Sequence, residues 1–174
     1  MKSRQLLAES GFPDGKGLPV IKLFTIPIYA EMANFIARQL EEVGINVQVE
    51  SVQKSLLFDM TSNSKVSFFR AGWIADYPDA ENYLSVFYSK NPAPPNYTRY
   101  KNPEFDALFE KALSAENDSL RYRLYQQADA LMIRDAPVVP LWYDKVVWLV
   151  QTSVSGFKPN PLNLLELRRV SLAD

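Results

Sequence analysis

Apolar residues recur at regular intervals along the first part of the chain, and the interval changes from one segment to the next. Residues 20–26 are rich in β-branched side chains and residues 45–52 alternate strictly between apolar and polar, so both predict β-strands. Between them, apolar residues at about 29–43 recur every three or four positions, which predicts an amphipathic helix. Gly44 follows that helix at the position where a left-handed glycine often ends a helix.

The same alternation of elements continues to residue 73. Residues 3–10 predict a short helix before the first strand, a second short helix is expected at about 55–61, and residues 65–73 predict a third strand. Strands and helices that alternate with short connections are typical of an α/β sheet with right-handed crossovers. We therefore expect an α/β fold.

The second half of the chain has a different organisation. Residues 79–88 predict a helix, and the proline-rich residues 90–103 predict a long loop. Asn102, followed by proline and glutamate, has the character of a helix cap, and it starts a predicted helix that runs to about residue 115. A further helix at about 119–134 completes a predicted helical hairpin.

The C-terminal part contains apolar, β-branched segments. Residues 136–143 and 146–151 are strand-like and separated by two polar residues, which predicts a β-hairpin. Residues 164–172 predict a last strand. We find no internal repeat and no low-complexity segment.

Composition narrows the classes of function. A chain of 174 residues with 47% hydrophobic and 22% charged residues fits one globular domain or at most two small ones. The net charge of -1 and the pI of about 5.6 argue against nucleic-acid binding and against attraction to anionic membranes. With no Cys and no His, thiol nucleophiles, histidine acid–base pairs, haem ligation and ordinary zinc sites are excluded. No cofactor is expected.

Targeting signals are also missing from this sequence. The apolar run at residues 6–8 is too short for a secretory signal, and no run reaches the length of a membrane-spanning helix. Because the chain starts directly at a predicted helix, we expect it to be a fragment of a longer protein.

An aromatic residue and three carboxylates gather just after the third predicted strand. Trp73 is followed by Asp76, Asp79 and Glu81. Their spacing, with a proline and no glycine, does not fit a calcium loop of the EF-hand type. Asp79 precedes a predicted helix, so we expect it to cap that helix, and Glu81 suits the first turn of the same helix.

The roles of Asp76 and Arg70 cannot be decided from the residues alone. Asp76 lies beyond the strand, where open α/β sheets bind ligands, but its spacing alone favours a solvated turn carboxylate somewhat over a ligand group. Arg70 stands in an apolar strand and needs a partner, either an internal carboxylate or an anionic ligand group. Trp73 fits either the core or a pocket wall.

Other aromatic residues have the same ambiguity. The pairs Tyr97/Tyr100 and Trp142/Tyr143 can each cover the core or offer a face to a ligand. We find no Gly-rich phosphate loop after a strand, no nucleophile elbow and no distinguished pair of carboxylates. The residues therefore predict a ligand-facing turn and no enzyme.

Several stretches, in order, carry a resemblance to a known family. The motif W-x-A-D-Y-x-D at residues 73–79 and the N-P-E-F-D helix start at 102–106 are the most specific of them. The others are LLAESGFPDGKGLPVIKL, EEVGINVQVESV, RYRLYQQADALMIRDAPVVPLWY and VWLVQTSVSGF. With these, nearly the whole chain resembles the C-terminal lobe of the family 5 extracytoplasmic solute-binding proteins, the oligopeptide- and dipeptide-binding components of ABC importers.

The resemblance implies a fold and a set of ligand contacts. The fold is a type II periplasmic-binding-protein lobe, with a mixed sheet, helices on both faces and a helical hairpin. By the same resemblance Asp76 holds the α-ammonium of a peptide, the backbone of Gly72 to Ile74 pairs with the extended peptide, and Arg70 meets a carboxylate. Trp73 and Tyr77 complete the ligand-binding set that the resemblance implies.

The resemblance also implies partners and a location. The expected partners are a peptide, a missing N-terminal lobe with which residues after about 138 belong, and the permease subunits of an ABC importer. The parent protein is expected in the periplasm, or lipid-anchored outside the cytoplasmic membrane, and in contact with the membrane only indirectly. The alternatives are the sensory domain of a cytoplasmic transcription regulator and a binder of another solute, such as a sugar or a metal complex.

Overall fold

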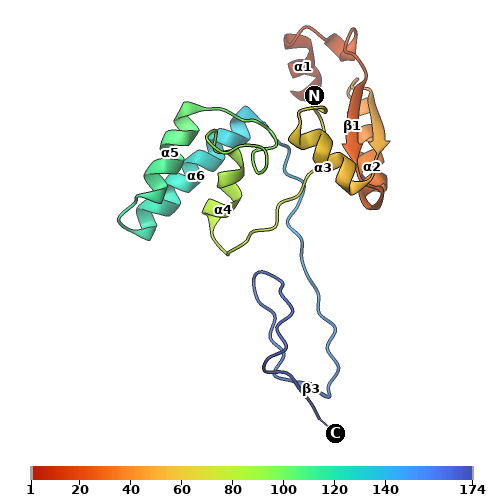
Figure 1. Cartoon of the computed structure of the whole chain (residues 1–174). Helices are drawn as coiled ribbons and strands as arrows, with labels where there is room; N and C mark the ends of the chain where they lie inside the picture. Colours follow the sequence, from red (N-terminus) through yellow and green to blue (C-terminus); the bar gives the residue numbers. More distant parts are fainter. Residues whose placement is uncertain (1, 174) are drawn as a thin grey trace. The chain divides into compact units, whose positions relative to one another are not determined.

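The computed structural model describes residues 2–173, which form two compact units divided between Gly72 and Trp73. The first unit contains a small sheet and helices α1 to α3, and the second contains helices α4 to α6 and a long C-terminal segment (Figure 1). None of the helices among residues 2–173 combines the length and the apolar character needed to cross a membrane.

The sheet of the first unit is parallel and follows the predicted strands. Strand β1 (Ile21–Thr25) pairs with strand β2 (Val47–Ser51), in register from Ile21 opposite Val47 to Thr25 opposite Ser51. Helix α2 (Ala30–Glu41) connects the two strands, as a parallel pair requires (Figure 1). The 3₁₀ turn η2 (Pro27–Tyr29) leads into α2, and α3 (Lys54–Ser62) follows β2.

The prediction of a third strand over residues 65–73 is wrong in its length. A single parallel bridge joins Phe69 to Phe24, supported by hydrogen bonds from the Phe24 N–H to the Phe68 carbonyl and from the Arg70 N–H to the Phe24 carbonyl. An apolar, β-branched run becomes a strand only where a neighbour supplies a ladder of hydrogen bonds. Here the ladder extends over one residue.

Gly44 ends the first long helix as its position predicts. The Ile45 N–H donates to the Leu40 carbonyl and the Gly44 N–H donates to the Glu41 carbonyl, which is the hydrogen-bond pattern of a Schellman motif. Gly44 has a φ of 97°, and a Cβ added there would lie 2.4 Å from the Asp14 carbonyl oxygen. The turn is therefore packed against the 3₁₀ turn η1 (Pro13–Gly15), which follows helix α1 (Lys2–Glu9).

The second unit is built on the predicted helical hairpin. Helix α5 (Pro103–Leu113) starts at Asn102, whose Oδ1 accepts hydrogen bonds from the backbone N–H groups of Glu104 and Phe105. Helix α6 (Asp118–Asp135) packs against it, and α4 (Ala80–Leu84), continued by the 3₁₀ turn η3 (Ser85–Phe87), completes the unit. The buried core consists of Leu84, Phe105, Phe109, Ala112, Tyr125, Ala128, Leu131 and Met132.

The proline-rich loop before α5 is fixed by a buried asparagine. The side chain of Asn96 donates to the carbonyls of Tyr88 and Tyr100 and accepts from the Tyr100 N–H. The Tyr100 ring lies edge-on to Phe105 and its hydroxyl donates to Asp135 over 2.6 Å. Burial, followed by this hydrogen bond, raises the pKa of Tyr100 to about 12. Tyr100 therefore covers the core.

The predicted hairpin of residues 136–143 and 146–151 is wrong. Both segments lack strand pairing and many of their apolar side chains are exposed, with Leu149 96% exposed. The last predicted strand is reduced to β4 (Ser171–Leu172), which pairs antiparallel with β3 (Val154–Ser155). The pattern of residues 136–151 favours a strand, but no strand of the described chain runs beside it.

Candidate functional site

The six predicted ligand residues fall on both sides of the boundary between the units. Arg70 and Gly72 close the first unit. Trp73, Ile74, Asp76 and Tyr77 open the second and form the turn that leads into helix α4. The geometry of each group is defined within its own unit.

A buried asparagine holds the turn of the second unit. Asn82 is 4% exposed, and its Oδ1 accepts one hydrogen bond from the Trp73 indole N–H at 2.8 Å and another from the Asp76 backbone N–H at 3.2 Å. Asn82 is the third residue of α4, and helical side chains lean toward the N-terminus of their helix. Its amide therefore reaches back to the turn.

The carboxylate of Asp76 projects from this turn without an internal partner. Asp76 is exposed, and within residues 2–173 its side chain forms neither a hydrogen bond nor an ion pair. Ile74 is 83% exposed and Trp73 is 36% exposed. A carboxylate in this position can accept charge-assisted hydrogen bonds from a cationic group that approaches from solvent.

Tyr77 is tied to the start of helix α4. Its hydroxyl donates to the Glu81 carboxylate, and this hydrogen bond is the main reason that the pKa of Tyr77 is raised. Tyr77 as a whole is 45% exposed. Glu81 therefore serves both the first turn of α4, as its position predicts, and the orientation of Tyr77.

Asp79 caps helix α4 as predicted and has a second role that its position did not indicate. Its Oδ1 accepts from the Glu81 N–H at 2.9 Å, and its Oδ2 lies 2.7 Å from the Arg121 guanidinium of helix α6. Burial raises the pKa of Asp79, but the hydrogen bond from Glu81 and the Arg121 charge together outweigh it, so the pKa lies below its ordinary value. This ion pair fixes α4 to α6.

We expect Asp79→Asn to remove the ion pair with Arg121 and to keep the helix cap, because asparagine caps a helix as well as aspartate does. At pH 7 the variant should lose about 1 kcal/mol of unfolding free energy, measured by urea denaturation. Because folding lowers the pKa of Asp79, its charged carboxylate stabilises the folded protein. This stabilisation is fully present above the ordinary pKa of about 3.8 and is lost as the pH falls through the pKa of the folded state. The difference from the wild type should therefore shrink below about pH 4.

The matched control for this prediction is Asp118→Asn. Asp118 contacts the same guanidinium at 3.3 Å but its side chain is 75% exposed, so the loss should be smaller. An equal loss in both variants, or a difference that does not shrink as the pH falls below about 3.8, would contradict the assignment.

A small cavity adjoins this part of the second unit. It has a volume of about 270 Å³ and is lined by Tyr77, Asp79, Glu81, Leu113, Arg121 and Tyr125. Of the predicted ligand residues, it includes Tyr77. Asp79 and Arg121, both in its lining, form a direct ion pair.

In the first unit, Arg70 finds an aromatic partner. Its guanidinium carbon lies 3.5 Å from the centre of the Tyr29 ring, a cation–π arrangement, and it pairs with no carboxylate of the described chain. Gly72 lies beside it, because a Cβ added there would be 3.5 Å from an Arg70 guanidinium nitrogen. The positive charge of Arg70 is therefore partly exposed and not neutralised within the unit.

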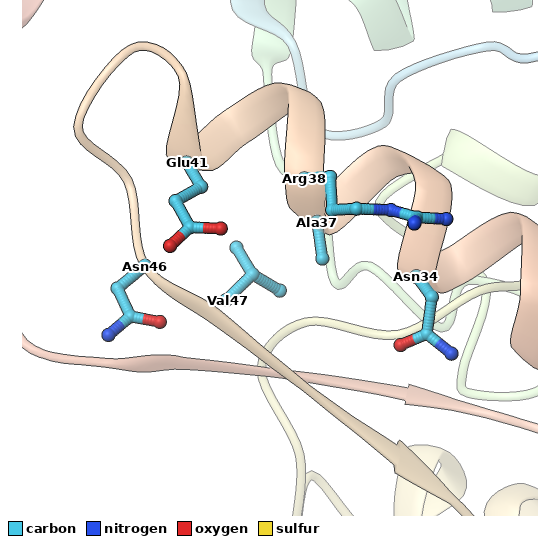
Figure 2. A pocket seen from close by; sticks show the side chains of 6 residues that line it. All are labelled: Asn34, Ala37, Arg38, Glu41, Asn46 and Val47. Carbon is cyan, nitrogen blue, oxygen red and sulfur yellow. The ribbon is translucent and has the colours of Figure 1, made fainter.

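A second cavity in the first unit contains none of the predicted residues. It measures about 420 Å³ and lies against α2 and the start of β2, lined by Asn34, Ala37, Arg38, Glu41, Asn46 and Val47. Figure 2 shows its helix-borne residues along one side of α2, with Asn46 and Val47 across from them. The side chains are mixed in charge and do not converge on a point.

The part of the chain that is described holds no group of three His, Cys, Asp or Glu side chains arranged to bind a metal ion. Asp79 pairs with Arg121 and Glu81 accepts from Tyr77, whereas the Asp76 carboxylate has no partner among residues 2–173. The turn of the second unit therefore offers one carboxylate, that of Asp76, that is exposed and has no partner among the described residues.

Sequence reasoning missed Asn82 and Arg121. A polar residue at the third position of a helix can reach back to the preceding turn, which is a signal for Asn82. An arginine in the first turns of a helix opposes the helix dipole, and this unfavourable position is a signal that Arg121 has an acidic partner.

Comparison with known proteins places the chain among solute-binding proteins. The profile of the "Bacterial extracellular solute-binding proteins, family 5 Middle" matches residues 1–95, more than half of the chain. The periplasmic oligopeptide-binding protein OppA of Salmonella typhimurium is 30% identical over 158 residues, which cover 90% of this chain and 29% of that protein. The chain spans about a third of the length of the curated relatives it matches.

Two further relatives differ in what their names say they bind. Heme-binding protein A of Haemophilus influenzae is 28% identical over 92% of this chain and 30% of its own length. The ABC transporter-associated periplasmic binding protein DppA of Helicobacter pylori, solved in complex with the peptide STSA, superposes with a TM-score of 0.80 at 29% identity, over 98% of this chain and 34% of that one. The fold is therefore that of part of a type II periplasmic binding protein.

Proposed function

Since the chain belongs to the bacterial extracellular solute-binding proteins of family 5, we propose that it supplies one half of the ligand site of an ABC importer's substrate-binding component. The ligand is an oligopeptide or a dipeptide. The observation that carries the proposal is the exposed carboxylate of Asp76, which has no partner within residues 2–173 and lies on a turn whose backbone is fixed by Asn82.

Asp76 binds the α-ammonium group of the peptide. A hydrogen bond to a charged group contributes about 1.5–3 kcal/mol net, and it contributes most when the acceptor is already oriented before the ligand arrives. The hydrogen bond that fixes the Asp76 N–H supports such an orientation. Trp73 and Tyr77, each partly exposed, supply apolar walls beside it.

Arg70 binds a carboxylate of the ligand, at its C-terminus or on a side chain. Its guanidinium is stacked on Tyr29 and forms no ion pair with any residue that the structure describes, so a ligand carboxylate would add a charged partner. The backbone between Gly72 and Ile74 pairs with the extended peptide, which gives affinity that does not depend on the peptide's side chains.

The chain is the C-terminal lobe of a longer, two-lobed protein that closes on its ligand by a hinge motion. Residues after about 138 pack against the N-terminal lobe. The exposure of Val139, Tyr143 and Leu149 supports this arrangement, because a contiguous series of exposed apolar residues is costly in water. The lobe itself catalyses no reaction.

The partners of the intact protein are the peptide and the permease subunits of the importer. It works in the periplasm or anchored by lipid outside the cytoplasmic membrane. The periplasmic relatives support this location.

A non-peptide solute is the second candidate, because one relative is named for binding haem. The chain contains no histidine or cysteine, so a haem iron would need another type of ligand from this lobe. A cytoplasmic regulator is the third candidate, and a helix-turn-helix before this lobe in the parent sequence would favour it.

Calorimetry on the intact protein tests the proposed function. A mixed library of di- to pentapeptides should bind, and acetylation of the amino terminus should weaken binding by about tenfold to a hundredfold, because it removes the charge that Asp76 meets. Acetylation of a lysine side chain in the same peptide is the matched control for a general effect of blocking a charge. If no peptide binds, or if haem binds instead, the peptide assignment is wrong.

A further inference from the structure

The turn that carries Asp76 is fixed by contacts that lie behind it. Asn82 is buried, yet its Oδ1 accepts two hydrogen bonds, from the Trp73 indole N–H and from the Asp76 backbone N–H. A buried amide without hydrogen-bond partners would destabilise the fold. The two hydrogen bonds that Asn82 Oδ1 accepts therefore hold both the turn and the Asn82 side chain in place. Both donors belong to the proposed ligand set.

Helix α4 delivers Asn82 to this position and is itself held at its start. Asp79 caps the helix and pairs with Arg121 on α6, while Leu84 is 5% exposed and belongs to the core of the second unit. The turn is therefore linked through Asn82 to a helix that is packed against the rest of the unit.

We propose that Asn82 is a positioning residue that orients Asp76 and Trp73 for the α-ammonium group of the ligand. This inference rests on the proposed function. Asn82 acts through its two hydrogen bonds and touches no ligand. By fixing the Asp76 backbone and the Trp73 ring before binding, it lowers the ordering cost of association.

The two hydrogen bonds of Asn82 can be tested by hydrogen exchange in the absence of any ligand. In Asn82→Ala, hydrogen exchange of the Asp76 amide and of the Trp73 indole N–H should accelerate by tenfold or more, because each loses its acceptor. The Trp142 indole, which donates to Asp144, is the internal control and should not change. Ser85→Ala is the matched variant, because it removes a hydrogen bond to the Asn82 carbonyl and leaves the side chain of Asn82 in place.

The second readout is the affinity of the intact protein for a free-amino peptide and for its N-acetylated form. Asn82→Ala should weaken the free-amino peptide by about tenfold and the acetylated peptide little, so the ratio between them falls. A general loss of packing would weaken both equally. Trp73→Phe should keep the Asp76 amide protected, because it removes one of the two donors only.

Two results would overturn the inference. In one, exchange at Asp76 and Trp73 is unchanged in Asn82→Ala. In the other, exchange accelerates but Asn82→Ala binds the free-amino peptide like the wild type, although Asp76→Asn weakens it. If Asp76→Asn also leaves the affinity unchanged, the proposed ammonium contact itself is wrong, and Asn82 positions no ligand group.

Discussion

Replacing Asp76 with asparagine should weaken the binding of a free-amino peptide to the intact protein by about tenfold to a hundredfold. The substitution keeps the size of the side chain and removes its charge, so the peptide α-ammonium loses a charge-assisted partner. The turn should stay intact, because Asn82 holds it through the Asp76 backbone N–H and not through the carboxylate. Titration calorimetry at constant ionic strength measures the change.

A thermodynamic cycle that combines Asp76→Asn with the N-acetylated peptide tests whether Asp76 contacts the peptide's amino group. Acetylation and Asp76→Asn should each weaken binding, and together they should weaken it little more than either alone, because both remove one interaction. Asp129→Asn is the control, since it removes an exposed carboxylate on helix α6. Losses that simply add would show that Asp76 and the amino group do not meet.

Phe105→Ala should lower the unfolding free energy of the second unit by about 3–5 kcal/mol. Phe105 has no exposed surface and lies among Phe109, Tyr100 and the rest of the helical core, so its removal leaves a cavity that the hairpin cannot close without strain. Trp73 belongs to the second unit and donates to Asn82 of helix α4, so its fluorescence during urea denaturation, with Trp142 and Trp148 replaced by phenylalanine, measures this change.

Leu113→Ala on the same helix is the matched control. Leu113 is 55% exposed, and its truncation should cost less than about 1 kcal/mol. Equal losses in the two variants would mean that α5 does not bury the side chains that the structure assigns to its core.

Local features of the fold could be predicted well from the sequence. Asn102 and Asp79 cap helices and Gly44 ends one, because each feature depends on backbone groups within a few residues. The parallel strands and the helical hairpin follow from the spacing of apolar residues, which sets the face that each element buries.

Features that need a distant partner could not be predicted in this way. The segments at 65–73 and 136–151 have the composition of strands, but strand formation depends on a neighbour that local sequence does not specify. The Asp79–Arg121 ion pair joins residues 42 positions apart, so no local spacing indicates it.

The sequence by itself determined which carboxylates of the turn are structural, since Asp79 and Glu81 occupy the cap and first turn of helix α4. By elimination it left Asp76, and it could not distinguish a ligand group from a solvated one. Only the tertiary structure decided that the Asp76 side chain is exposed and has no partner in the described part of the chain, while its backbone is held by a buried asparagine. The reason is physical: capping depends on hydrogen bonds along one stretch of chain, whereas exposure and burial depend on how the elements pack around it.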